Sequence, residues 1–156
     1  MNDIFVKIDG IKGESRDSVH AGAIDALSWS WSLKHAPGTL CNSGGRNPRA
    51  AVGDMVFTHG IDRACPNIAA FCWRGQHIPE VKVICRKAGG IPHEFWLYTL
   101  SDTMITQCEQ SGGGSTLIEQ VSISFVRMKM EYVLQDSMGG KGGTITAVID
   151  QSYERR

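Results

Sequence analysis

Residues 117–135 read LIEQVSISFVRMKMEYVLQ, a long run in which apolar and polar residues alternate. Apolar residues stand at odd positions from Val121 to Phe125 and at even positions from Val126 to Leu134. Because successive side chains of a β-strand point to opposite faces, a regular strand cannot keep one face buried across such a change of phase. We therefore predict a β-bulge or a sharp bend near Phe125 and Val126, of the kind that lets a sheet curl into a barrel.

Shorter segments of the same alternating pattern flank this stretch, and glycine-rich turns separate them. The pattern predicts further strands at 4–8, 24–33, 52–59, 80–87, 93–100, 103–109 and 144–150. One short helix is predicted between Pro66 and Gly75, since proline suits the first turn of a helix and glycine the position after its end. Two long loops, 10–23 and 34–51, connect these elements. The sequence thus predicts a mainly β fold with one helix.

Length, composition and charge restrict the possible classes of protein. The chain has 156 residues, a mass of 17.0 kDa and 42% apolar residues, which predicts a single domain spanning 1–156. Lysine plus arginine and aspartate plus glutamate each number 16, so the formal charge is zero. A zero net charge argues against a dedicated nucleic-acid or membrane-surface protein. The longest apolar run, 68–73, is far shorter than the about 20 residues that span a bilayer.

The N-terminus and the cysteines indicate a protein made in a cytosol. The first residues, Met1 to Ile4, lack the basic and apolar segments of a secretory signal peptide. Five cysteines at unrelated spacings indicate reduced thiols rather than a disulfide framework. If the protein leaves the cell, we expect a route that does not use a cleaved signal peptide.

Cysteine and histidine residues are candidates for metal ligands or for a catalytic pair. The only near pair of cysteines, Cys65 and Cys72, has the spacing of two core residues on one helix face, so no metal site is predicted. Cys41, with His35 or His59 beside it, would be the candidate nucleophile. No local feature activates its thiol, so we predict no catalytic residue. The phosphate-loop-like run 139–144 is followed by a strand pattern, which favours a hairpin connection.

The segment 24–33 allows two functional interpretations. Trp29 and Trp31 share one face and could stack on a ligand, although packing in the core is the simpler interpretation. The other face carries Ser28, Ser30 and Ser32. These small neutral side chains form either an ordinary solvent face or a smooth wall past which another molecule can move, and the residues alone do not decide between the two.

Several stretches, taken together and in order, resemble one protein family. They are K-G-E-S at 12–15, L-S-W-S-W at 27–31, R-K-A-G-G at 86–90 and E-Q-V-S-I-S-F at 119–125. In one register from about residue 3 to 135, the sequence resembles the Hcp family, the haemolysin-coregulated tube proteins of bacterial type VI secretion. Each stretch is a weak signal alone, but their order is specific.

The resemblance implies a structural protein rather than an enzyme. It implies a β-barrel of two antiparallel sheets with one flanking α-helix and long extended loops. Six copies would form a ring, and rings would stack into a tube that a contractile sheath expels behind a VgrG-type spike. The protein would be made in the bacterial cytoplasm, be secreted without a cleaved signal peptide and carry small effectors in its pore. No cofactor, nucleic acid or membrane is implied.

The resemblance also suggests where contacts lie. Strand 24–33 would belong to the tube wall, which makes Ser28, Ser30 and Ser32 candidates for lining the pore. The candidates for contact with a neighbouring ring or subunit stand in loop 34–51: His35, Arg46, Asn47 and Arg49.

The sequence departs from the family pattern at two places. Cys65 stands where a serine or threonine usually caps the helix, and bulky Trp73 and Arg74 precede Gly75.

The alternative function is a monomeric small-ligand-binding β-barrel with an apolar cavity around Trp29 and Trp31.

Overall fold

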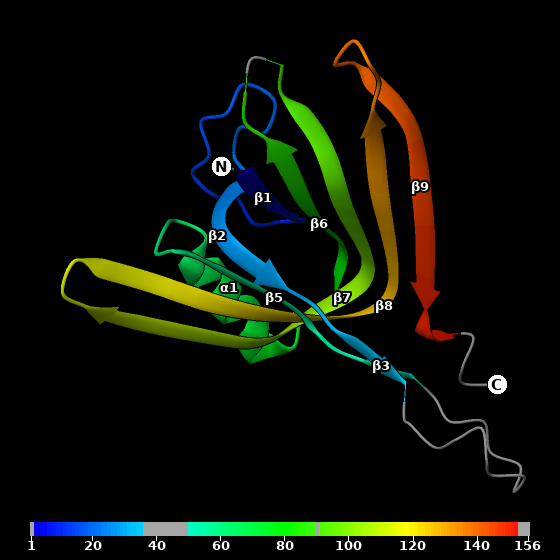
Figure 1. The fold of residues 1–156 in the computed structure, drawn as a ribbon. Helices are drawn as coiled ribbons and strands as arrows, with labels where there is room; N and C mark the ends of the chain where they lie inside the picture. The colour runs from blue at the N-terminus through cyan, green and yellow to red at the C-terminus, as the bar shows by residue number, and fades with distance from the viewer. Residues whose placement is uncertain (1, 36–49, 90, 153–156) are drawn as a thin grey trace, which may run out of the picture.

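The computed structural model describes residues 2–35, 50–89 and 91–152. Its main sheet is antiparallel and has the strand order β5-β2-β1-β6-β7-β8-β9. An additional pairing of β5 with β8 closes six of these strands into a barrel, and β9 extends the sheet beyond it (Figure 1). Strands β3 and β4 form a separate two-stranded sheet. The predicted mainly β fold, with a barrel, a second sheet and one flanking helix, is confirmed.

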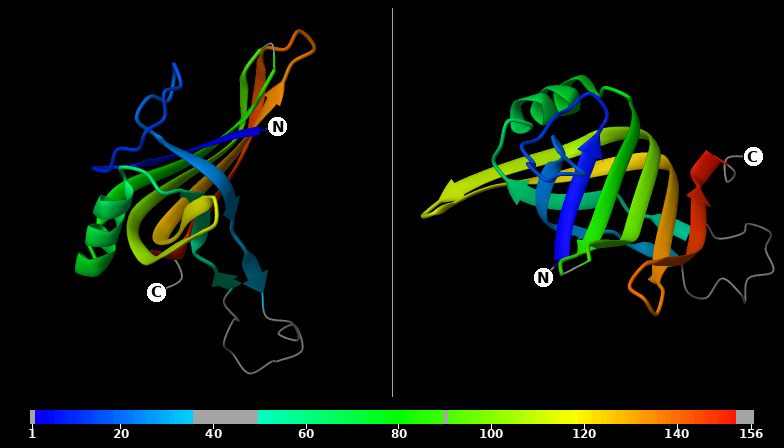
Figure 2. Two further views of the ribbon diagram at one scale, coloured as in Figure 1. Left: turned by 90° about the vertical axis from the view of Figure 1, so that its left-hand side faces the viewer. Right: turned by 90° about the horizontal axis from the view of Figure 1, so that it is seen from above.

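The bounds of the elements in the described residues follow. The strands are β1 (Asn2–Ile8), β2 (Ile24–Ser30), β3 (Leu33–His35), β4 (Ala50–Val52), β5 (Met55–Gly60), β6 (Ile78–Lys87), β7 (His93–Gly113), β8 (Thr116–Gln135) and β9 (Lys141–Asp150). The helix is α1 (Cys65–Arg74). It packs against the outside of the barrel, and the tip of the long β7–β8 hairpin projects past it (Figure 2).

Strand β8 bends where its pattern changes phase. Phe125 and Met128 are buried, whereas the two residues between them are exposed, so the inward face changes at this level. The register with β7 does not shift there, because Ser101 pairs with Arg127 and Thr103 with Phe125. Of the two predicted alternatives, the bend is therefore confirmed, and the prediction of a bulge at this point is wrong.

Strand β7 changes phase at the same level. Leu100 and Thr103 are buried, and between them Asp102 adopts a left-handed backbone conformation with φ 53°. Because both strands change their inward face together, the pairing continues through the bend. The segments 93–100 and 103–109, predicted as two strands, are consequently one strand.

Strand β2 contains a bulge that the alternating pattern does not reveal. Its register with β5 shifts between Ala26 and Ser28, which leaves Leu27 in the bulge and 64% exposed. Strict alternation along 24–33 predicts that Leu27 shares a face with Trp29 and Trp31, and this prediction is wrong because of the bulge. Beyond the bulge the alternation resumes, and the predicted single strand 24–33 is divided into β2 and β3.

The barrel is filled by aliphatic and aromatic side chains from the six closed strands and α1. Phe57 of β5 is completely buried, and on either side of it the inward residues are Trp29 of β2 and Val121 of β8. Trp29 and Trp31 both pack edge-on against Tyr98, whose ring centroid lies 5.0 Å from that of Trp29 and 6.4 Å from that of Trp31. The interior is therefore a packed core.

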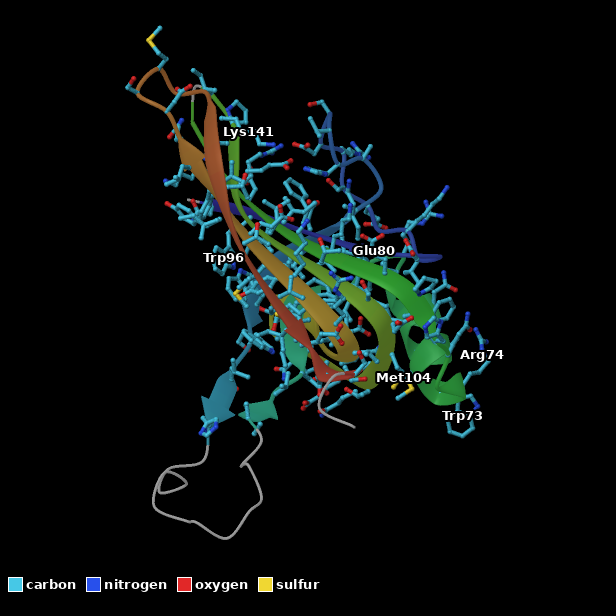
Figure 3. All side chains as sticks on the ribbon, turned by 90° about the vertical axis from the view of Figure 1, so that its right-hand side faces the viewer. Trp73, Arg74, Glu80, Trp96, Met104 and Lys141 are labelled. Atoms are coloured by element: carbon cyan, nitrogen blue, oxygen red, sulfur yellow. The ribbon has the colours of Figure 1, made fainter. Side chains whose placement is uncertain are left out.

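Helix α1 begins and ends as the sequence predicts. Pro66 lies in its first turn, and Gly75 after its end has a left-handed backbone with φ 58°. Cys65 begins the helix rather than capping it, and the Oδ1 atom of Asp62 accepts a hydrogen bond from the backbone N–H of Ala64 at 2.8 Å. Trp73 projects from the last turn and is 90% exposed (Figure 3).

An ion-pair network attaches loop 10–23 to the barrel. The Arg86 guanidinium of β6 lies 2.7 Å from a carboxylate oxygen of Asp17 and 3.0 Å from one of Asp3. The hydrogen bonds from Arg86 hold the pKa of the Asp17 carboxyl well below its usual range. The arginine of the R-K-A-G-G stretch thus positions the loop that follows the first strand.

Replacing Phe57 by alanine tests the packed barrel. We expect Phe57→Ala to lower the free energy of unfolding by about 3–5 kcal/mol, because it leaves a cavity among buried side chains. The neighbouring Val56 points outward on the same strand and is only half-buried, so Val56→Ala should cost about 1 kcal/mol or less. Urea denaturation measures both values, and equal losses would contradict the assigned faces of β5.

Acid unfolding tests the network around Arg86. A lowered pKa of Asp17 in the folded state contributes stability above the ordinary aspartate pKa of about 3.9, and this stability is lost as the pH falls below that value. We expect Arg86→Met to weaken the dependence of stability on pH in this acid range. Lys82→Met, which removes an exposed cation of the same strand 3.6 Å from Glu80, is the matched control. An unchanged acid dependence in Arg86→Met would contradict the assigned role.

Candidate functional site

A face of uncharged side chains lies on the outside of strands β2, β5 and β8 where these three strands pair. Ser28 pairs directly with Thr58, which in turn pairs with Gln120. One step along the strands, Ser30 pairs with Val56, which pairs with Ser122. We call this set the serine face: Ser28, Ser30, Val56, Thr58, Gln120 and Ser122.

The serine face follows from the alternation of the strands that carry it. Trp29, Phe57 and Val121 form the inward row between the two outward rows. Because directly paired residues of antiparallel strands share a face, the outward rows align across the three strands. Ser28 and Ser30 are exposed, whereas Ser122 is nearly covered.

The serine face carries no ionisable side chain, but acids stand at its border. Glu109 of β7 pairs directly with Gln120. Asp54, which precedes β5, accepts a hydrogen bond from the Thr106 hydroxyl at 2.7 Å. A molecule lying against the face would meet hydroxyl, amide and methyl groups, none of which binds strongly by charge.

The predicted pore-lining and contact residues do not all lie together. Ser32 is exposed but lies beyond the end of β2, where its carbonyl accepts a hydrogen bond from Gly53 N–H at 3.0 Å. His35 is exposed at the end of β3. Three predicted contact residues, Arg46, Asn47 and Arg49, and the candidate nucleophile Cys41 lie outside the described residues.

The two tryptophans predicted as a ligand-stacking pair have different surroundings. The indole N–H of Trp31 donates to the carbonyl of Gly53 at 2.9 Å, which fixes its ring over the core. Trp29 borders an open hollow of about 270 Å³ whose other lining residues are Asn2, Ile4, Cys85, Phe95 and Trp96. This volume is just below the about 300 Å³ at which small-molecule sites begin.

A polar cluster that the sequence did not predict lies inside the barrel, beside the start of α1. The Nε2 atom of His59 donates a hydrogen bond to Oε1 of Glu119 at 2.8 Å, and both side chains are completely buried. The Sγ atom of Cys65 lies 3.8 Å from the same nitrogen. We call His59, Cys65 and Glu119 the buried triad.

Burial and hydrogen bonds shift the pKa values of Glu119 and Cys65. Burial raises the pKa of Glu119, but hydrogen bonds donated chiefly by His59 and Gln110 outweigh it, so this pKa lies below its ordinary value. Burial also raises the pKa of the Cys65 thiol to about 12. The thiol is therefore protonated at neutral pH, which makes it a poor nucleophile.

A signal for the buried triad exists in the sequence. His59 stands at the same parity as the buried Met55 and Phe57, and Glu119 at the same parity as Val121 and Ile123. Ionisable residues at inward positions of two strands are expected to pair if those strands are neighbours. The pairing of β5 with β8 spans about 60 residues of chain and cannot be derived from either segment alone.

Comparison with known proteins identifies the family. Residues 5–132 match the family described as "Type VI secretion system effector, Hcp". The chain belongs to the Hcp family. Protein hcp1 of Pseudomonas aeruginosa is 36% identical over an alignment of 144 residues, and the alignment covers 90% of this chain and 89% of that protein.

Solved structures of Hcp proteins have the same fold. The crystal structure of Hcp1 from Salmonella typhimurium is 39% identical, with a TM-score of 0.80 over 97% of this chain and 96% of that one. A type VI secretion system effector from Yersinia pestis is 35% identical, with a TM-score of 0.79 over 95% of this chain and 99% of that one. The resemblance based on the K-G-E-S, L-S-W-S-W and R-K-A-G-G stretches is thereby confirmed.

Membership of the Hcp family places the chain among type VI secretion proteins, which are secreted and are not a known family of enzymes. Residues 136–140 join β8 to β9 as a hairpin, as predicted, and the phosphate-loop-like run 139–144 covers the end of this connection and the start of β9. Among the described residues, no helix has the length and apolar character needed to cross a membrane.

Proposed function

We propose that this Hcp protein is the building unit of a type VI secretion tube. Six copies, each a single domain spanning 1–156, associate into a ring, and rings stack into a tube with the serine face toward its channel. A contractile sheath surrounds the tube, a VgrG-type spike covers its tip, and small effectors travel inside. The protein leaves the bacterial cytoplasm by this route without a cleaved signal peptide.

The serine face is the observation that carries the proposal. A channel through which other proteins pass must be wide, flat and weakly interacting, so that cargo is held without being trapped. Small hydroxyl groups at Ser28, Ser30 and Thr58 fit this requirement, because they offer hydrogen bonds without fixed charge. Charged side chains would instead select cargo by its net charge.

The end of the main sheet supports self-association. Strand β9 pairs with β8 on one side, and in the described residues no strand pairs with its other side. Ile145 and Val148 of β9 are 64% and 46% exposed. An unpaired edge that bears apolar side chains is a natural contact for another copy, and a head-to-tail contact that closes on itself gives a ring. His35, Arg46, Asn47 and Arg49 remain proposed contacts with a neighbouring ring or subunit.

The alternative function, a monomeric small-ligand barrel, rests on the hollow beside Trp29. Trp96 also lines this hollow, and its indole N–H is buried without a hydrogen-bond partner. The packed interior of the barrel favours the tube, since a carrier of this kind needs its cavity inside.

The native mass of the purified protein separates the two functions. We expect multi-angle light scattering to find particles of about six times the 17.0 kDa chain mass, with annuli in negative-stain images. A ligand carrier predicts single chains whose tryptophan fluorescence changes when an apolar ligand is added. Single chains at high protein concentration would contradict the proposed ring.

A bulky residue on the serine face tests its place in the channel. We expect Ser30→Trp to leave the native mass unchanged and to reduce the amount of effector that co-purifies with the hexamer. The reason is that six tryptophan side chains, one from each copy, would narrow the channel. Ser18→Trp changes an exposed serine of loop 10–23 and should leave effector binding unchanged. Intact effector binding by Ser30→Trp rings would place the serine face away from the cargo.

A further inference from the structure

We propose that the buried triad is a binding site for a zinc-class transition metal ion, held by Nε2 of His59, Sγ of Cys65 and a carboxylate oxygen of Glu119. This site lies inside the barrel and is independent of the proposed tube.

Three separate elements bring the ligands together. His59 ends the buried part of β5, Glu119 is its direct partner on β8, and Cys65 is the first residue of α1. All three side chains are buried, and their ligand atoms lie within 4.8 Å of one another. A histidine, a cysteine and a glutamate together provide the nitrogen, sulfur and oxygen donors found in zinc sites.

The distances between these atoms are close to those around one tetrahedral ion. Bonds of about 2.0 Å to nitrogen or oxygen and about 2.3 Å to sulfur give ligand separations of about 3.3–3.8 Å. Sγ of Cys65 lies 3.8 Å from Nε2 of His59. The hydrogen-bonded separation of 2.8 Å between His59 and Glu119 needs to lengthen by about half an ångström when an ion replaces the shared proton.

Two supporting groups stand behind the ligands. The Nδ1 atom of His59 is buried and has no hydrogen-bond partner. A carboxylate oxygen of Asp62 is 3.5 Å away from this nitrogen. The side-chain amide of Gln110 donates to Oε2 of Glu119 at 2.7 Å. A carboxylate behind a histidine and a hydrogen bond to a carboxylate ligand are the contacts that orient metal ligands in proteins.

The donors favour zinc over the common alkaline-earth ions. Calcium and magnesium prefer six or more oxygen ligands, which the buried triad does not offer. Imidazole and thiolate ligands suit Zn²⁺, and Co²⁺ adopts the same tetrahedral geometry. Gln110 is exposed, so the cluster lies directly beneath the surface, and an ion can reach it when this side chain moves.

Binding changes the protonation of two ligands in a balanced way. The Cys65 thiol loses its proton to solvent as the sulfur–metal bond forms. The metal replaces the proton on Nε2 of His59, and this proton moves to Nδ1, from which it can be donated to Asp62. Glu119 is already ionised. The reaction therefore releases one proton for each metal ion, from the Cys65 thiol.

Cobalt titration of the full-length chain tests the site. After removal of metal with a chelator, Co²⁺ should bind once per chain and produce a thiolate-to-cobalt charge-transfer band with the visible bands of a tetrahedral ion. Zn²⁺ should abolish these bands by displacement, with release of protons into the buffer. Failure of Co²⁺ to bind, or binding without a charge-transfer band, would overturn the proposal.

Matched variants assign the ligands. Cys65→Ser should abolish or strongly reduce the charge-transfer band, whereas Cys85→Ser, which changes a cysteine of equal burial on β6, should leave it intact. Gln110→Ala removes only an exposed supporting group and should weaken Co²⁺ binding by about 10–100-fold without loss of the fold. A charge-transfer band retained by folded Cys65→Ser would contradict the site. If Cys65→Ser does not fold, the Co²⁺ affinity of Gln110→Ala is the test, and an affinity equal to that of the unmodified protein would contradict the site.

Discussion

The pairing of β8 with three other strands organises this structure. Strand β8 follows β7 along most of its length, while its first half also pairs with β5 and its second half with β9. The change of partner occurs where the inward face of the strand changes, between Phe125 and Met128. One bend thus lets the same strand close the barrel at one end and extend the sheet at the other.

Closure of the barrel determines what lies inside and outside. The row through Trp29, Phe57 and Val121 fills the core, and the adjacent rows form the serine face. The same alternation, continued two residues further along β5, places His59 opposite Glu119 in the interior. The proposed channel wall and the proposed metal site are therefore two consequences of one strand pairing, although each has its own test.

Local features of the fold could be predicted from the sequence, because local rules determine them. Pro66 and Gly75 marked the helix, and the change of apolar parity near Phe125 marked the bend. The bulge at Leu27 and the continuous strand through Asp102 could not be predicted, since neither position carries a glycine or a turn sequence. The sequence does indicate a break at Asp102, a residue type that adopts left-handed conformations more often than most, but it does not show that the pairing with β8 continues through this point.

The candidate sites likewise have features that the sequence predicts and features that it does not. The outward position of Ser28 and Ser30 followed from alternation, but their proposed role came from the resemblance to the Hcp family. The buried triad depends on two strands that are distant in sequence, and Cys65 joins it only because α1 begins beside them. Spacing between cysteines and histidines, which is the usual guide to metal sites, contains no information on such a cluster.

A cryo-electron microscopy reconstruction of the purified protein tests the assignment of the serine face most directly. We predict a sixfold ring in which the outer surfaces of β2, β5 and β8 line the central channel, with Ser30 toward its axis. A ring with this face on its outer surface or buried between copies, or a field of single chains, would contradict it.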